Sequence, residues 1–127
     1  MDEIKLLIVD DEVEFASALA ERLELRNYHV DTANSGTEAL KGLGSTYFPD
    51  IILLDLRMPD MSGFDVLVKI KEKHPAIEVI MLTGHGASSG GSSSLEKGAF
   101  AFIMKPVNIC DLTKKIQEAY KNRTSAP

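Results

Sequence analysis

Short runs rich in leucine, isoleucine and valine alternate along the 127-residue chain with segments whose apolar residues recur at helical spacing. Runs that are apolar throughout, such as residues 6–9 and 51–54, are typical of strands buried on both faces of a parallel sheet. The pattern predicts five strands, at residues 6–9, 29–33, 51–54, 79–82 and 99–104. We therefore expect an α/β protein in which helices cover both faces of a parallel sheet.

Helical spacing of apolar residues predicts four helices between and after these strands. They lie at residues 15–23, 39–43, 66–70 and 112–120. The last of them begins near Asn108 or Asp111, because both residue types cap helix N-termini. The strands and helices together make a (βα)5 pattern in which the fourth helix is doubtful.

That fourth helix would fall at residues 87–96, where the sequence reads ASSGGSSSLE. The five Ser and two Gly residues of this tract disfavour a helix by roughly 4 to 5 kcal/mol relative to Ala. We expect residues 88–94 to be frayed, irregular or displaced, with any helix confined to the end near residues 95–97. Two origins of the tract remain open, a natural polar loop and a helix deliberately rewritten as a flexible segment.

The net charge and the cysteine content limit which partners and which cellular compartment we expect for this protein. The net charge of −5 provides no diffuse basic surface for a phosphate backbone, so direct binding to nucleic acid is not expected. Cys110 is the single cysteine and cannot form a disulfide within the chain. With no apolar run near 18 residues and no N-terminal apolar segment, the sequence predicts a cytoplasmic protein without a membrane partner.

Polar and charged residues follow four of the five predicted strands. The first strand ends in the sequence DDE at residues 10–12, the third in Asp55, the fourth in Thr83 and the fifth in Lys105. These ends meet at one edge if the sheet has the flavodoxin-like order 2-1-3-4-5. Carboxylates grouped in one crevice repel one another, so this grouping predicts a divalent cation with oxygen ligands, for which Mg²⁺ fits best.

Each of these residues also has a purely structural interpretation. Asp10 and Asp11 could cap the first helix, and Asp55 could be a turn residue. Thr83 could be a β-former at a strand end, and Lys105 a salt-bridged surface residue. Their combination at four converging strand ends favours the functional interpretation.

Four motifs carry a resemblance to a known family. They are LLIVDDE at residues 6–12, IILLDLRMPDMSG at 51–63, VIMLTGHG at 79–86 and GAFAFIMKPV at 98–107. In this combination the chain resembles the CheY-like receiver domain of bacterial two-component response regulators. The resemblance spans residues 4 to about 122, and we expect a receiver domain at residues 1–122 followed by a polar tail at 123–127. A stand-alone receiver and one excised from a larger regulator both remain open.

The resemblance implies that Asp55 is the phosphoacceptor. It makes Asp10 and Asp11 the acidic pair that binds Mg²⁺ together with Asp55, and the backbone carbonyl of Arg57 a further metal ligand. Physical chemistry supports these roles, because transfer to a carboxylate depends on neutralising the oxygens of the incoming phosphoryl group.

The resemblance also implies a conformational switch. Lys105, preceding a cis bond to Pro106, and Thr83 would each contact a phosphoryl oxygen. Thr83 would move toward the phosphoryl group, and Phe102 would turn inward to fill the vacated space. Phe102 could instead be an ordinary core residue. The face that reports this movement includes the Ser/Gly tract, so we expect the tract to alter the output and to leave the phosphorylation chemistry intact.

The implied function is a phosphoacceptor in a phosphorelay, with a histidine kinase or phosphotransfer protein as donor. An output domain or downstream protein would receive the signal, and a phosphorylation-dependent homodimer is one form of the response. The protein would be a signalling domain and not an enzyme. The only reactions that it would catalyse are its own phosphorylation and its own slow dephosphorylation.

Two alternatives remain open. An engineered or degenerate receiver would act as an interaction module with impaired output. A phosphatase of the haloacid dehalogenase type also places a nucleophilic Asp after a strand, but it needs a second acid two residues later, where this chain has Arg57.

Overall fold

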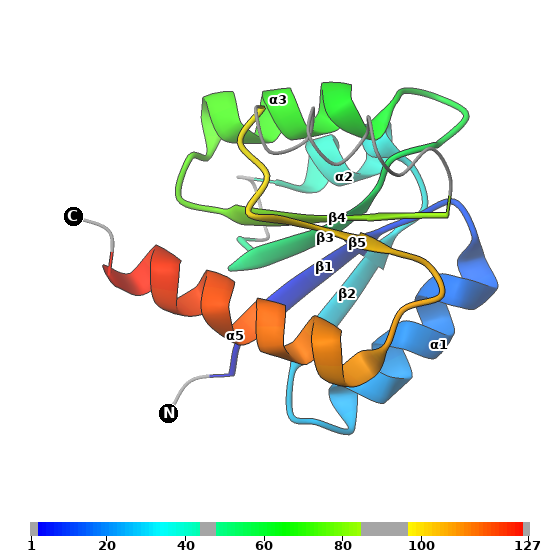
Figure 1. Ribbon diagram of the computed structural model, residues 1–127. Helices are drawn as coiled ribbons and strands as arrows, with labels where there is room; N and C mark the ends of the chain where they lie inside the picture. Colours follow the sequence, from blue (N-terminus) through cyan, green and yellow to red (C-terminus); the bar gives the residue numbers. More distant parts are fainter. Residues whose placement is uncertain (1–2, 44–47, 85–96, 126–127) are drawn as a thin grey trace.

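The computed structural model describes residues 3–43, 48–84 and 97–125, which form one parallel sheet with helices on both faces (Figure 1). The strands are β1 (Lys5–Val9), β2 (His29–Ala33), β3 (Ile51–Asp55), β4 (Glu78–Thr83) and β5 (Ala101–Met104). Their order in the sheet is β2-β1-β3-β4-β5, and every neighbouring pair is parallel. This architecture confirms the predicted flavodoxin-like α/β class and strand order.

The described helices are α1 (Val13–Glu24), α2 (Gly36–Gly42), α3 (Gly63–Lys73) and α5 (Ile109–Ser125). Helices α1 and α5 cover one face of the sheet, and α2 and α3 cover the other (Figure 1). Helix α5 continues into the first residues of the expected polar tail. The prediction for residues 88–94 falls outside the described residues. No described helix has both the length and the apolar character needed to cross a bilayer.

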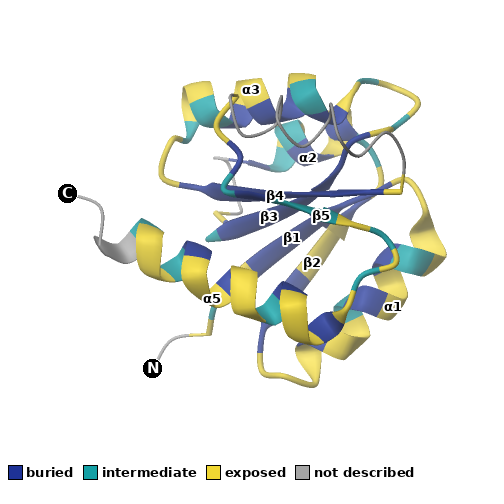
Figure 2. Cartoon of the chain, viewed as in Figure 1, coloured by how far each residue is buried: buried dark blue, intermediate teal, exposed yellow. Residues whose placement is uncertain are grey.

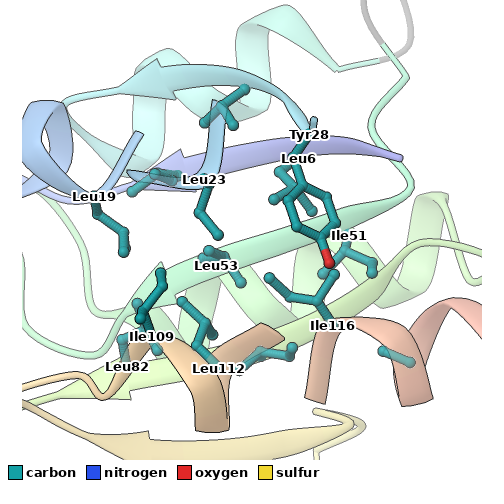
Figure 3. Packing of buried hydrophobic residues seen from close by; sticks show 14 of the residues in the cluster. Leu6, Leu19, Leu23, Tyr28, Ile51, Leu53, Leu82, Ile109, Leu112 and Ile116 are labelled. Carbon is teal, nitrogen blue, oxygen red and sulfur yellow. The ribbon is translucent and has the colours of Figure 1, made fainter. Parts of the chain in front are cut away.

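The core consists of two apolar layers, one on each face of the sheet, because successive strand side chains point to opposite faces. Along β1, Leu6 and Ile8 pack toward α1 and α5, whereas Leu7 and Val9 pack toward α2 and α3. Strands β3 and β4 are buried throughout (Figure 2). Figure 3 shows the first layer, in which side chains of α1, α5 and the sheet interdigitate.

Polar caps set the starts of α2, α3 and α5, which is why these three helices begin before the predicted apolar stripes. The Ser35 hydroxyl accepts the Glu38 N–H at 3.0 Å, and the Ser62 hydroxyl accepts the Asp65 N–H at 3.3 Å. At α5, the Asn108 side chain accepts the N–H of Asp111 at 3.1 Å. Asn108 is therefore the cap of the last helix.

Candidate functional site

Three aspartates meet at the carboxyl edge of the sheet, where β1 and β3 end side by side. The register pairs Val9 with Leu54, which places Asp10 next to Asp55. Asp10 and Asp55 are buried, whereas Asp11 is exposed. One carboxylate oxygen from each of the three lies within 4.8 Å of the others. Closely spaced carboxylate oxygens are the donors that a hard divalent cation prefers, so these residues fit a metal site.

The local turn after β1 aims the Asp10 side chain at this edge. The Asp10 N–H donates to the Ala33 carbonyl at 3.0 Å, and the Asp10 carboxylate accepts the Glu12 N–H at 2.9 Å. Glu12 occupies the N-cap position of α1 and makes no side-chain capping bond there. The interpretation of Asp10 and Asp11 as the cap of α1 is therefore wrong.

The environment of Asp55 opposes its negative charge. Burial and then the nearby Asp10 carboxylate raise the pKa of Asp55 from 3.8 to about 6. The Lys105 ammonium and the N–H of Arg57, which bonds the Asp55 carboxylate, lower the pKa by less. A cation bound beside a carboxylate in such a setting would stabilise its ionised form.

Lys105 reaches into this group of acids from the end of β5. Its Nζ lies 2.9 Å from Asp10, 2.8 Å from Glu12 and 3.8 Å from Asp55. Burial lowers the pKa of Lys105, but its hydrogen bonds to Glu12 and Asp10 outweigh burial, and the net pKa is raised. The expected cis bond between Lys105 and Pro106 is present.

Two partners of Lys105 were missed by sequence reasoning. The Glu12 side chain holds the Lys105 ammonium, whose Nζ also lies 4.2 Å from the centroid of the Phe15 ring. Phe15 was assigned only to the apolar stripe of a helix. Glu12 is the N-cap of α1 and Phe15 lies in its first turn, so both stand at the end of α1 that meets Lys105, and no periodicity in the sequence marks this contact.

Thr83 and Phe102 lie on neighbouring strands near the same edge. Thr83 is the last residue of β4 and is 1% exposed. The register pairs Met81 with Phe102 and Thr83 with Met104, so Phe102 lies diagonally across from Thr83. Phe102 is partly buried and packs against the layer under α2 and α3. It is thus neither a fully buried core residue nor a fully exposed one.

Gly63 is a further residue whose role the sequence did not reveal. A Cβ at this position would lie 2.3 Å from the Asp55 carbonyl oxygen and 2.8 Å from the Leu56 Cα. The Gly63 N–H donates to the Leu56 carbonyl at 2.8 Å. Helix α3 therefore begins in direct contact with the backbone of Asp55, and only a residue without a side chain permits this approach.

Comparison with known proteins agrees with this geometry. The family model for the response regulator receiver domain matches residues 6–117. The transcriptional regulatory protein CpxR homolog of Haemophilus influenzae is 38% identical over 123 residues, which are 97% of this chain and 52% of that protein. ResD of Bacillus subtilis is 38% identical over 117 residues, covering 91% of this chain and 48% of its own length. The chain thus spans about half the length of these relatives.

Solved structures show the same fold. A CheY-like receiver domain from Methanospirillum hungatei superposes with a TM-score of 0.90 at 34% identity, covering 97% of this chain and 98% of the other. The beryllofluoride-activated NtrC4 receiver domain dimer gives a TM-score of 0.87 at 37% identity, covering 94% and 98%. With the fold, the acidic edge and the family model in agreement, the chain belongs to the response regulator receiver domain family.

Proposed function

We propose that the protein is the phosphoacceptor of a two-component phosphorelay and that Asp55 receives the phosphoryl group. The observation that carries this proposal is the position of Asp55, buried at the sheet edge with Asp10, Asp11 and the Lys105 ammonium around it. The donor is a histidine kinase or a phosphotransfer protein.

Mg²⁺ is the cofactor that we assign to this edge. Asp10, Asp11 and Asp55 would supply carboxylate oxygens, and the backbone carbonyl of Arg57 would supply a further oxygen. When bound, the ion neutralises negative charge on the incoming phosphoryl oxygens. The raised pKa of Asp55, to about 6, supports a site that is completed by a cation.

The chemistry of Asp55 is a direct displacement at phosphorus. A carboxylate oxygen forms the new P–O bond while the P–N bond of the donor phosphohistidine breaks, which leaves an acyl phosphate on Asp55. Lys105, already 3.8 Å from Asp55, would contact a phosphoryl oxygen, and the Thr83 hydroxyl would donate to another. Water attack on the acyl phosphate reverses the modification slowly.

The response would travel through Thr83 and Phe102, which lie diagonally on β4 and β5. Movement of Thr83 toward the phosphoryl group would free space into which Phe102 turns. The signal would then pass to an output domain or a downstream protein, and one form of it would be a phosphorylation-dependent homodimer. The dimeric state of the beryllofluoride-activated NtrC4 receiver supports that form, and the relatives' role in transcription supports a cytoplasmic location.

Mass spectrometry after incubation with acetyl phosphate and Mg²⁺ tests the proposed function. We expect one added phosphoryl group on the wild-type protein, none on Asp55→Asn, and normal labelling of the control Asp31→Asn, which changes an exposed aspartate on β2. EDTA should stop the labelling, because Lys105 alone would then face the phosphoryl oxygens. Labelling of Asp55→Asn, or equal labelling in EDTA, would contradict the proposal.

A further inference from the structure

The loop between β3 and α3, residues 56–62, is hydrogen-bonded to the start of α2. The Asp60 carboxylate accepts the Thr37 hydroxyl at 2.7 Å and the Thr37 N–H at 2.9 Å through one oxygen. Its other oxygen accepts the Gly36 N–H at 3.3 Å. Three donors from the first turn of α2 thus converge on one loop side chain that is 23 or 24 residues away in the sequence.

Apolar packing reinforces the same contact. A Cβ at Gly36 would lie 2.6 Å from the Met61 Cγ and 2.7 Å from the Val66 Cγ2. Met61 follows Asp60 directly, so the loop lies against α2 through a polar residue and through its apolar neighbour. Such double contact leaves the loop little freedom to move relative to α2.

The two ends of the loop are also held. At one end, Leu56 accepts the Gly63 N–H and donates its own N–H to the Leu82 carbonyl at 3.3 Å. Arg57, the next residue, donates its N–H to the Asp55 carboxylate. Because Arg57 is exposed, packing of its side chain does not fix its backbone. The position of the Arg57 carbonyl therefore depends on how the rest of the loop is held.

The same contacts with Thr37 keep the Asp60 side chain in its charged form. The Thr37 hydroxyl, followed by the Thr37 N–H, lowers the pKa of Asp60 to about 2. Asp60 therefore accepts these hydrogen bonds as a carboxylate at any physiological pH.

We propose that Asp60 and Thr37 are positioning residues for Mg²⁺ binding. Their contact anchors the loop on α2 and thereby keeps the Arg57 carbonyl in place as a metal ligand. Mg²⁺ demands near-ideal octahedral geometry, so a carbonyl on an unanchored loop would bind it poorly. This inference rests on the proposed Mg²⁺ site. It adds that the contact between α2 and the loop influences the affinity of that site for Mg²⁺.

Thr37→Val and Thr37→Ser separate this role from simple electrostatics, because neither substitution changes the charge of the protein. Mg²⁺ titrations followed by amide NMR shifts, without any phosphoryl donor, give the dissociation constant. Thr37→Val removes the hydroxyl and should weaken Mg²⁺ binding roughly tenfold, as the loss of a residue that orients a metal ligand commonly does. Thr37→Ser keeps the hydroxyl and should bind Mg²⁺ within about twofold of wild type.

Two controls sharpen the test. Thr113→Val removes a hydroxyl that bonds the Cys110 carbonyl on α5 and should leave Mg²⁺ binding unchanged. Asp60→Asn should weaken binding as Thr37→Val does, and in metal-free protein both variants should shift the amide signals of residues 56–62. Urea unfolding in EDTA measures separately how far each variant lowers stability.

The outcomes are distinguishable. A wild-type protein that binds no Mg²⁺ would overturn the proposed metal site itself. Wild-type binding with unchanged affinity in Thr37→Val and Asp60→Asn would overturn this inference alone and leave the contact a helix cap. Equal weakening by Thr37→Val and Thr37→Ser would also overturn it, since the hydroxyl would then not be the responsible group.

Discussion

At the scale of single residues, the site consists of two buried carboxylates, Asp10 and Asp55, with the positively charged Lys105 beside them. The Lys105 ammonium pairs with Asp10 at 2.9 Å and lies 3.8 Å from Asp55, so the same cationic side chain lies close to both acids. Burial of Asp55 makes its ionised form costly, and Asp10 adds repulsion. A bound divalent cation and a phosphoryl group would each redistribute these contacts, which makes titration and substitution direct probes of the site.

The raised pKa of Asp55 predicts a pH-dependent stability. Because the pKa is about 6 in the folded protein and 3.8 as an unperturbed value, the folded state holds this proton more tightly than the unfolded chain. In EDTA, the stability from this group should be fully present below about pH 4 and lost as pH rises through about 6. The loss should amount to roughly 3 kcal/mol at most.

Denaturant unfolding between pH 4 and 7 checks this dependence. Asp55→Asn should flatten this part of the profile, and so should saturating Mg²⁺. Asp60, with its pKa lowered to about 2, titrates below the window and does not interfere. An unchanged slope in Asp55→Asn would show that another group is responsible.

Lys105→Ala should separate phosphorylation from its structural consequence. The substitution removes a cation that competes for Asp10, so Mg²⁺ affinity should stay equal or rise. The substitution would also remove the proposed charge-assisted contact to the phosphoryl group, so the NMR shifts that phosphorylation induces around Phe102 should shrink strongly. Lys115→Ala, which breaks an exposed pair with Glu118, is the matched control. Full-sized shifts around Phe102 in Lys105→Ala would rule out this role.

At the scale of elements, the site depends on how closely helices approach the strand ends. Helix α1 and its N-cap residue Glu12 follow β1 and bring Glu12 and Phe15 to Lys105, and α3 begins against the backbone of Asp55. In both cases the first turn of a helix lies beside the candidate chemistry. Small changes at a helix start should therefore act on the site as well as on the fold.

Gly63→Ala tests the contact between α3 and Asp55. A methyl group 2.3 Å from the Asp55 carbonyl oxygen cannot be accommodated without moving α3, so the free energy of unfolding should fall by roughly 1–3 kcal/mol or more. Phosphorylation by acetyl phosphate should slow as well. Gly42→Ala is the control, because nothing lies within 4 Å of a Cβ there, and it should stabilise by roughly 0.5–1 kcal/mol. Equal effects of the two substitutions on stability would contradict the close approach.

At the scale of the whole molecule, the sheet separates two apolar layers. The edge at the carboxyl ends of its strands also differs from the edge at their amino ends. The carboxyl edge holds the acids and Lys105, whereas the amino edge is tied to the end of α5. There Arg123 pairs with Asp50 at 3.2 Å, and Asn122 donates to Glu78. Helix α5 therefore spans the sheet from the Lys105 side to the opposite edge, and the buried strands beneath it support both (Figure 1).

Leu53→Ala should show how much the buried sheet contributes to the stability of the protein. Leu53 is fully buried in the layer under α1 and α5, so the substitution should cost roughly 2–5 kcal/mol. Leu25→Ala, at a side chain that is 83% exposed, should change stability by less than about 0.5 kcal/mol. Urea unfolding measures both. Similar losses in the two variants would mean that burial does not determine their contributions.

Local pattern was sufficient for the elements and for much of the candidate site. Apolar runs predicted the central strands because a strand buried on both faces is mostly apolar, as residues 51–54 of β3 and 79–82 of β4 are. Parallel order then implied that Asp10 and Asp55 would share one edge, which the register confirms. Strand β5 begins at Ala101, two residues later than expected, and the Phe100 N–H just before it donates to the Val79 carbonyl.

Other features of the site depend on contacts between segments far apart in the sequence. Glu12 meets Lys105 across 93 residues, and Thr37 meets Asp60 across 23. Gly63 must be a glycine because of a backbone that folds against it from eight residues away. A charge, a hydroxyl or a missing side chain has no periodic signature along a chain, so its partner is decided only when packing of the two cores brings the segments together.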